Sequence, residues 1–417
     1  MLSTLARTCF RRRRLVLAIW ILAAISAGLL AGVAGGEYEN DFSQPGTESQ
    51  AAFDLLDERF PEHSGESGQI VFQVDGSVND PGASQRIERF LEDASKVDTV
   101  SGVISPFQEP LGRISKDGSI AYADIMFSTG GPEVPEATID ELNRMRVEAS
   151  EVDGFTVEYG GLAFAFAEQE PPGEGEIVGL IAAVVILLIS FGSFIAMVLP
   201  IVTALFGIGI ALALLTLSAN IISVPFFAPQ IATMIGIGVG IDYALFIVTR
   251  YRDALREGVS PPDAVVLALT TSGRAVVFAG LVVVVSLLGI LLMGFSFVEG
   301  VAVGGASAVA MTLLASITLL PAILGFAGAK IDKITIGRKR RKDAGHGFWY
   351  RWSRTIQRRP WVPALVGLGA LLALSAPLLD IRIGVADAGN GPESRTTRRA
   401  YDLVSEGFGP GFNGPLV

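Results

Sequence analysis

The 417-residue sequence has a single cysteine, Cys9, and only two histidines, His63 and His346. One cysteine excludes an intrachain disulfide and a metal site built from thiolates. The two histidines lie far apart in polar stretches, so we do not expect them to share a metal ion. The polar part of the chain also shows no candidate nucleophile and no phosphate-binding glycine loop. These absences disfavour an enzyme, and the sequence indicates neither a metal nor another cofactor.

Basic residues are scarce between Glu37 and Glu176, where there are 30 Asp and Glu but only 8 Lys and Arg. This acidic block carries a charge of −22, and because the whole chain carries −10, the remaining segments together are strongly basic. Cytoplasmic loops of membrane proteins are enriched in Lys and Arg. The segregation therefore predicts that the acidic block faces away from the cytoplasm and that the basic segments face it.

Apolar residues, in contrast, make up 50% of the sequence and lie in long runs. A helix that crosses a bilayer needs about 20 mostly apolar residues. We therefore predict a polytopic α-helical membrane protein with about seven transmembrane helices in this chain. Their expected ranges are Leu15–Val33, Ile177–Ala196, Pro200–Ser218, Ile231–Val248, Arg274–Met293, Phe297–Phe326 and Trp361–Leu379. A cleavable signal peptide is the competing interpretation of the first run, because small residues follow it.

These helices divide the chain into six parts. They are a cytoplasmic flank with helix one (1–36), an extracytoplasmic domain (37–176), helices two to six (177–328), a basic cytoplasmic linker (329–360), helix seven (361–380) and the start of a second extracytoplasmic domain (381–417). If Arg11–Arg14 hold the N-terminus in the cytoplasm, seven crossings place every basic cluster on the cytoplasmic side. We interpret the run Arg338–Lys342 as a membrane collar drawn to anionic lipid, with nucleic-acid binding as the disfavoured alternative.

The acidic domain over 37–176 shows patterns of both strands and helices. Short apolar runs predict strands at 69–74, 100–107, 119–127 and 155–159, and amphipathic spacing predicts helices at 47–60, 82–97 and 136–152. Elements in this order indicate a small α+β, ferredoxin-like domain in which helices cover one face of a sheet. Its acidic residues are scattered, and we interpret nearly all of them as solvated surface.

The sequence also contains an internal repeat. Phe53–Phe60 (FDLLDERF) resembles Tyr401–Phe408 (YDLVSEGF) at an offset of 348 residues, and in both copies basic residues, an apolar run and a polar linker come first. Internal repeats of this size build many transporters. Because the second copy has only begun at Val417, we expect this chain to be a fragment of a longer protein. A natural half-protein that a partner chain completes is the alternative.

The fourth predicted helix contains an acid in its interior. A charged residue at the centre of a membrane helix costs about 2.5–3.5 kcal/mol, so a functional role for Asp242 is the first hypothesis. Gly238 lies one turn before Asp242 on the same face, whereas Gly236 and Gly240 lie on the face of Tyr243. Small residues let neighbouring helices approach closely. The alternative is that Asp242 is a polar bridge between helices and that the glycines form a packing seam.

Arginines follow this helix and begin the next one. Arg250, Arg252 and Arg256, and then Pro261 and Pro262, follow the fourth predicted helix in a short loop whose charge predicts a cytoplasmic location, and Arg274 begins the fifth predicted helix. Arginine is enriched where membrane helices meet the cytoplasm. We interpret all four arginines as cytoplasmic anchors at the membrane surface.

These segments together resemble the MMPL family of the resistance–nodulation–division (RND) superfamily. Gly238-Val-Gly-Ile-Asp242-Tyr243 with the terminal Arg250-Tyr-Arg252 resembles the family's fourth-span signature, and two further segments, Thr270–Gly280 and Leu319–Ala322, are similar to its fifth-span start and sixth-span exit. The resemblance covers the whole chain. It implies a bacterial plasma-membrane exporter of lipids or other amphiphiles, driven by inward proton flow, with 37–176 as its porter domain.

In that family the Asp–Tyr pair of the fourth span forms a proton relay with a matching pair in span ten. The resemblance assigns the first half of the relay to Asp242 and Tyr243, and the repeat offset predicts the second acid near position 590. The expected partners are protons, a lipid or amphiphilic substrate and membrane lipids, without nucleic acid; a homo-oligomer or accessory envelope proteins are open. Two other functions also stay open, a protein-export auxiliary of the same superfamily and a sterol-sensing-type scaffold that transports nothing.

Overall fold

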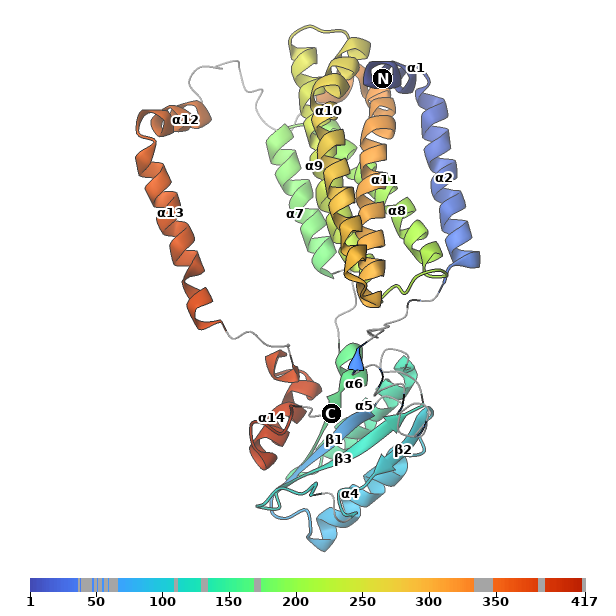
Figure 1. Cartoon of the computed structure of the whole chain (residues 1–417), viewed down its shortest axis with the longest axis vertical. Helices are drawn as coiled ribbons and strands as arrows, with labels where there is room; N and C mark the ends of the chain where they lie inside the picture. Colours follow the sequence, from blue (N-terminus) through green and yellow to red (C-terminus); the bar gives the residue numbers. More distant parts are fainter. Residues whose placement is uncertain are drawn as a thin grey trace. The chain divides into compact units, whose positions relative to one another are not determined.

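The structure is a computed structural model that describes residues 1–36, 67–108, 112–128, 134–168, 174–333, 348–381 and 387–414, with the single positions 38, 47, 48, 51, 55 and 59. It divides into two compact units, labelled by element in Figure 1. We call Met1–Gly65 with Gln169–Gly337 the helical unit, and Glu66–Glu168 with Arg338–Val417 the α+β unit. The run Arg338–Lys342 and most of the predicted helix over 47–60 lie outside the described residues.

The helical unit is a bundle of long apolar helices (Figure 1). α8, α9 and α11 pack on one another, α10 packs against α9 and α11, and α2 packs against α8 and α11. The elements are α1 (Leu2–Arg11), α2 (Arg13–Ala34), α7 (Glu174–Phe191), α8 (Phe194–Ser218), α9 (Ala228–Arg256), α10 (Pro261–Leu288), α11 (Ser296–Ala327) and the 3-10 turns η3 (Gly289–Met293) and η4 (Gly328–Asp332).

Six helices in the described ranges are long and apolar enough to cross a membrane. They are α2, α8, α9, α10 with η3, α11 with η4, and, in the α+β unit, α13 (Trp361–Ser375) with η5 (Ala376–Asp380). α7 is also apolar, but its apolar stretch Ile177–Phe191 is shorter. These helices give the chain the architecture of a polytopic α-helical membrane protein, and the role of α7 as a further span stays a prediction.

The start of α8 differs from the prediction. The helix begins at Phe194, although we expected the span to start at Pro200. Ser193 is the N-cap, and its hydroxyl oxygen accepts a hydrogen bond from the amide of Ala196 at 3.4 Å. Gly192 provides the left-handed backbone (φ +60°) that lets α7 turn directly into α8.

The prediction for the start of α10 is also wrong. We expected Pro261 and Pro262 in a loop, but α10 begins at Pro261. Proline suits the first helical turn because the amides there have no partner within the helix. The hydroxyl of Ser260, the N-cap, donates to Asp263 Oδ2 at 2.7 Å and stabilises this end. Arg274 therefore lies well inside α10 and not at its start.

The α+β unit contains one four-stranded antiparallel sheet in the order β2-β3-β1-β4. Its first elements are β1 (Ser67–Val74), α4 (Pro81–Ala94), β2 (Val100–Ile104), β3 (Ile120–Phe127), α5 (Glu136–Ser150), β4 (Phe155–Gly161) and α6 (Leu162–Ala167). The structure thus confirms the four predicted strands and the helices predicted over 82–97 and 136–152, with small shifts at their ends. The later elements are α12 (Phe348–Arg358), α13, η5, η6 (Ala388–Asn390) and α14 (Thr396–Phe408).

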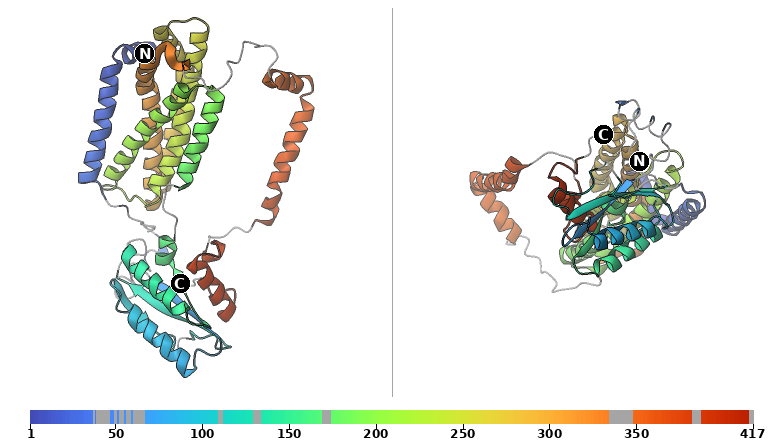
Figure 2. Two further views of the ribbon diagram at one scale, coloured as in Figure 1. Left: turned by 180° about the vertical axis from the view of Figure 1, so that it is seen from behind. Right: turned by 90° about the horizontal axis from the view of Figure 1, so that it is seen from below.

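The two faces of this sheet are covered by different parts of the chain. Side chains alternate between the faces of a strand, and Ile70 and Phe72 of β1 join a core with Leu142 of α5 and residues of α4. Val71 points to the other face and packs in a cluster with Val404 of α14. Figure 2 shows α14 on the opposite side of the sheet from α4 and α5. We predicted helices on one face of the sheet. The other face is covered by α14, which belongs to the second copy of the repeat.

Candidate functional site

α9 directs the two residues of the candidate site to different surroundings. Asp242 is exposed on the surface of the helical unit, whereas Tyr243 is buried. Successive residues on an α-helix are about 100° apart around its axis. The carboxyl group and the phenol ring therefore leave α9 in different directions.

The face of α9 that carries Asp242 is an uncovered ridge. Met234, Gly238, Asp242 and Phe246 follow at four-residue spacing, and all four are exposed. A Cβ added at Gly238 would meet no atom within 4 Å. Within the described part of the chain, the Asp242 carboxylate has no hydrogen-bond or ion-pair partner. An acid on such a ridge is costly in a bilayer unless a polar partner or a water-filled cavity faces it.

Gly236 and Gly240 lie on a buried face of α9 and allow close contact with two other helices. A Cβ at Gly236 would lie 2.8 Å from the Ile208 side chain of α8. A Cβ at Gly240 would lie 2.9 Å from Ala204 Cβ of α8 and 3.1 Å from Thr312 Cγ2 of α11. Any larger residue would force these helices apart, so glycine at both positions sets the spacing of α9 from its neighbours.

Tyr243 packs between α10 and α11. Its buried neighbours include Val276 of α10 and Leu313 of α11. Gly280 of α10 leaves room for the ring, because a Cβ at this position would lie 3.2 Å from Tyr243 Cε2 and 2.8 Å from Leu313 Cδ2. We did not predict a role for Gly280 from the sequence. The available signal was its position seven residues after Gly273, on the same face of one helix.

Arg252 is the most deeply placed of the four arginines. Its residue is 5% exposed, and Nη2 donates to the carbonyl oxygen of Phe191 at 2.9 Å and lies 2.6 Å from Asp332 Oδ1. The guanidinium carbon also lies 5.1 Å from the centre of the Phe191 ring. Phe191 is the last residue of α7, where unpaired carbonyls attract a cation. Arg252 thus joins α7, α9 and η4.

The other three arginines are more accessible. Arg250 is half-buried, Arg274 is exposed on α10, and Arg256 is exposed with Nη1 3.3 Å from Asp253 Oδ1. Exposed pairs of this kind contribute little to stability. The anchor role of these residues stays a prediction.

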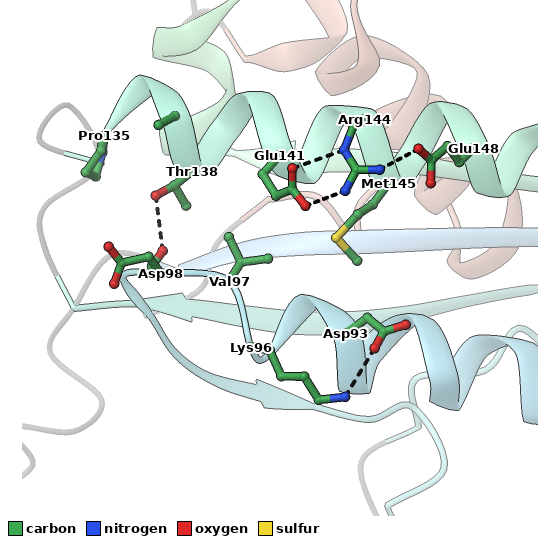
Figure 3. A pocket seen from close by; sticks show the side chains of 11 residues that line it. Asp93, Lys96, Val97, Asp98, Pro135, Thr138, Glu141, Arg144, Met145 and Glu148 are labelled. Carbon is green, nitrogen blue, oxygen red and sulfur yellow. Dashed lines mark hydrogen bonds and ion pairs between the residues drawn. The ribbon is translucent and has the colours of Figure 1, made fainter.

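A cavity of about 640 Å³ lies between α4, α5 and the loop after α4 in the α+β unit (Figure 3). Charged side chains around it already pair with one another. Lys96 lies 3.0 Å from Glu92 and 3.2 Å from Asp93, and Arg144 bonds to Glu141 and Glu148. The ion pairs of Arg144 raise its pKa, and the hydrogen bonding that it donates to Glu141 is the main cause. The cavity is therefore a weak candidate for binding a charged ligand.

The interface between α14 and β4 contains a buried polar network. The side chain of Glu158 on β4 is 6% exposed, and Arg399 of α14 reaches it with Nε at 2.5 Å and Nη2 at 3.0 Å. The hydrogen bonding that Arg399 donates to Glu158 is the main cause of its raised pKa. Arg146 of α5 approaches the same carboxylate at 3.4 Å, and the hydroxyl of Thr396 donates to it.

Glu168 stabilises the N-terminal end of α14. Its Oε1 accepts a hydrogen bond from the amide of Thr396 at 2.6 Å, and its Oε2 accepts one from the hydroxyl of Thr397. An acid at a helix N-terminus pairs with otherwise unsatisfied amides. The contacts of Glu158 and Glu168 escaped sequence reasoning, because their partners on α14 lie 241 and 228 residues away in the sequence. For Glu158, the alternating pattern of β4 alone predicts a solvated face.

Comparison with known proteins identifies a family match and several relatives of this chain. A model of the MMPL family matches residues 41–363. The Bacillus subtilis membrane protein YdfJ is 35% identical over 421 residues, covering 100% of this chain and 57% of its own length. The mycolic acid-containing lipids exporter MmpL11 of Mycolicibacterium smegmatis is 29% identical, and the heme uptake protein MmpL11 of Mycobacterium tuberculosis 28%; in both pairs 99% of this chain and 44% of the relative are covered. The chain thus spans about half the length of these curated relatives.

Proposed function

Because this chain belongs to the MMPL family, we propose that it forms part of a proton-driven secondary transporter that exports lipids or other amphiphiles across the plasma membrane. The six membrane-length helices in the described ranges support a multi-pass position in the membrane. One relative is named as an exporter of mycolic acid-containing lipids, which supports a lipidic cargo. Another is named for heme uptake, which supports an amphiphilic cargo and makes the direction of transport a quantity to measure.

The observation that carries this proposal is Asp242, which is exposed on an apolar helix and has no hydrogen-bond or ion-pair partner among the residues that the structure describes. The relatives are about twice as long as this chain. We propose that helices equivalent to their other half cover the ridge around Asp242 and that span ten contributes a matching acid and tyrosine. Asp242 then binds a proton from one side of the membrane and releases it to the other. Each proton that crosses about 100 mV supplies about 2.3 kcal/mol.

Tyr243 has a complementary role in this proposal. Its ring contacts α10 and α11, so a displacement of α9 on protonation of Asp242 is transmitted to both helices through packed side chains. Gly236 and Gly240 keep α9 close to α8 and α11, which makes these contacts sensitive to small shifts.

We further propose that the α+β unit includes a ferredoxin-like porter domain outside the cytoplasm. The βαββαβ order of its first elements and its acidic composition support this assignment. The N-terminus and the basic segments face the cytoplasm, and α7 serves as a further span. The boundaries given in the sequence analysis then divide the chain between membrane and porter domain.

The direct test uses the complete protein that contains this chain, reconstituted in vesicles with a phospholipid that carries a fluorescent acyl chain. With the acidic compartment on the side of the proposed porter domain, we expect the lipid to move toward that side and to stop when a protonophore collapses the gradient. A parallel measurement with heme tests the other cargo. Movement of the lipid that is independent of the gradient would contradict the proposal.

Two other outcomes point to other functions. Accumulation of secretory precursors on depletion, with unchanged envelope lipids, would favour a protein-export auxiliary. A depletion phenotype that protonophores do not alter would favour a scaffold without transport. We propose no enzymatic activity and no cofactor, because the relatives are named as membrane or transport proteins.

A further inference from the structure

An apolar groove of about 350 Å³ lies between α2 and α11 in the helical unit. Its α2 wall consists of Val16, Ile19, Trp20 and Ala23, and α11 contributes Met311 among others. None of the residues proposed for the proton relay lines this groove. It is therefore separate from the site on α9.

The α2 wall follows from helical periodicity. Val16, Ile19, Trp20 and Ala23 have the spacing of a single helix face. Trp20 forms the buried part of the wall, since it is 6% exposed and its Nε1 donates to Thr318 Oγ1 of α11 at 3.1 Å. Ile19 is 55% exposed and marks the open side. The groove thus has a rigid floor and opens at the surface of a membrane-length helix.

A basic residue stands directly before α2. Arg12 is the N-cap of this helix, four residues before Val16, and its carbonyl oxygen accepts a hydrogen bond from the Val16 amide at 3.0 Å, which places its backbone at the start of the helix face that lines the groove. The residue is exposed, and its guanidinium has no ion-pair or hydrogen-bond partner among the described residues. Arg13, in contrast, is already engaged, because it donates to the carbonyl oxygen of Gly325 and stacks on Phe326 at 5.0 Å. A phosphate group is a natural partner for the unpaired guanidinium of Arg12.

We propose that the α2–α11 groove binds one acyl chain of an anionic phospholipid, whose phosphate is held by Arg12 at the membrane surface. Lipid is the medium that surrounds a membrane-spanning α2, and the walls of the groove are apolar. The lipid is a resident of the bilayer and not the transported cargo, so this proposal does not depend on the proposed function.

Photocrosslinking in vesicles tests the assignment on the complete protein. The probe is phosphatidylglycerol with a diazirine on one acyl chain, and phosphatidylcholine with the same chain is the zwitterionic comparison. We expect crosslinks on the groove face of α2, at Ile19 and Ala23, to be favoured by the anionic probe, and unlabelled phosphatidylglycerol to compete better than phosphatidylcholine. This competition needs no variant and is independent of any folding defect.

Two pairs of variants locate the site. Arg12→Gln should lower the preference for the anionic probe about fivefold, the effect of about 1 kcal/mol per basic residue near a membrane surface, whereas Arg14→Gln on another side of α2 should change it little. Ala23→Phe should fill the groove and remove the crosslinks there, and Ala18→Phe, on an exposed face outside the groove, should retain them. Equal labelling by both probes, crosslinks spread evenly around α2, or no crosslinks in the groove would overturn the proposal.

Discussion

The ion pair between Arg399 of α14 and Glu158 of β4 allows a quantitative test of how the second repeat is held on the sheet. Arg399→Met removes the guanidinium group and keeps most of the side-chain stem. The Glu158 carboxylate, 6% exposed, then loses two of its hydrogen bonds, at 2.5 and 3.0 Å. It stays buried, because the rest of the interface still covers it.

The expected magnitude follows from the surroundings of the pair. Removing one partner of a buried ion pair costs about 3–5 kcal/mol. Two features reduce this value here: the Arg399 side chain is 37% exposed, and Arg146 remains 3.4 Å from Glu158. We therefore expect Arg399→Met to lower the free energy of opening of α14 by about 2 kcal/mol.

Amide hydrogen exchange on the complete protein measures this opening directly. A loss of about 2 kcal/mol corresponds to about 30-fold faster exchange in α14 and along β4. Arg398→Met is the matched control, because Arg398 pairs with the half-exposed Asp402 one turn away and should change exchange about twofold or less. Equal effects of the two variants, or unchanged exchange in Arg399→Met, would refute the assignment of Glu158 and Arg399 as the polar centre of this interface.

Three further predictions concern other parts of the structure. Gly240→Leu should lower the thermal stability of the purified protein by about 1–3 kcal/mol through overpacking, whereas Gly209→Leu, on an exposed part of α8 where a Cβ would meet no atom within 4 Å, should unfold like the parent. Burial raises the pKa of Tyr159, so above pH 10.0 the folded form keeps a phenol proton that the unfolded chain loses. The free energy of unfolding should therefore fall as the pH rises above 10.0. Tyr159→Phe should flatten this dependence in a pH series of denaturation curves. Arg252→Met should destabilise the helical unit by about 2–4 kcal/mol in thermal unfolding, because it removes the ion pair with Asp332 and the hydrogen bond to the Phe191 carbonyl, while Arg256→Met should have little effect.

Much of the fold follows from patterns that are local in the sequence. Apolar runs of membrane length predicted the long helices, and short alternating runs predicted the four strands, because burial and periodicity act within each element. Helix ends were harder to predict. The sequence places Pro261 and Pro262 before the apolar run, and composition alone does not show that proline starts α10 there.

The parts that escaped prediction depend on contacts between distant segments. Glu158 and Arg399 meet across 241 residues, and Arg252 meets Phe191 across 61. Periodicity predicted that Asp242 and Gly238 share one face of α9. It did not predict that this face lies on the exposed side of the bundle. Sequence reasoning therefore identified the candidate acid, and the structure adds that its partner must come from outside the described residues if the acid is to be paired.

Gradient-driven transport in a matched pair of variants tests the central claim most directly. Asp242→Asn removes the candidate proton carrier, and Asp253→Asn changes an acid at the end of the same helix that pairs with Arg256. Both are made in the complete protein and reconstituted with the fluorescent phospholipid under an acid-outside gradient. We predict that Asp242→Asn abolishes gradient-driven lipid movement in a folded protein and that Asp253→Asn retains it. Unimpaired gradient-driven movement in Asp242→Asn would contradict the account.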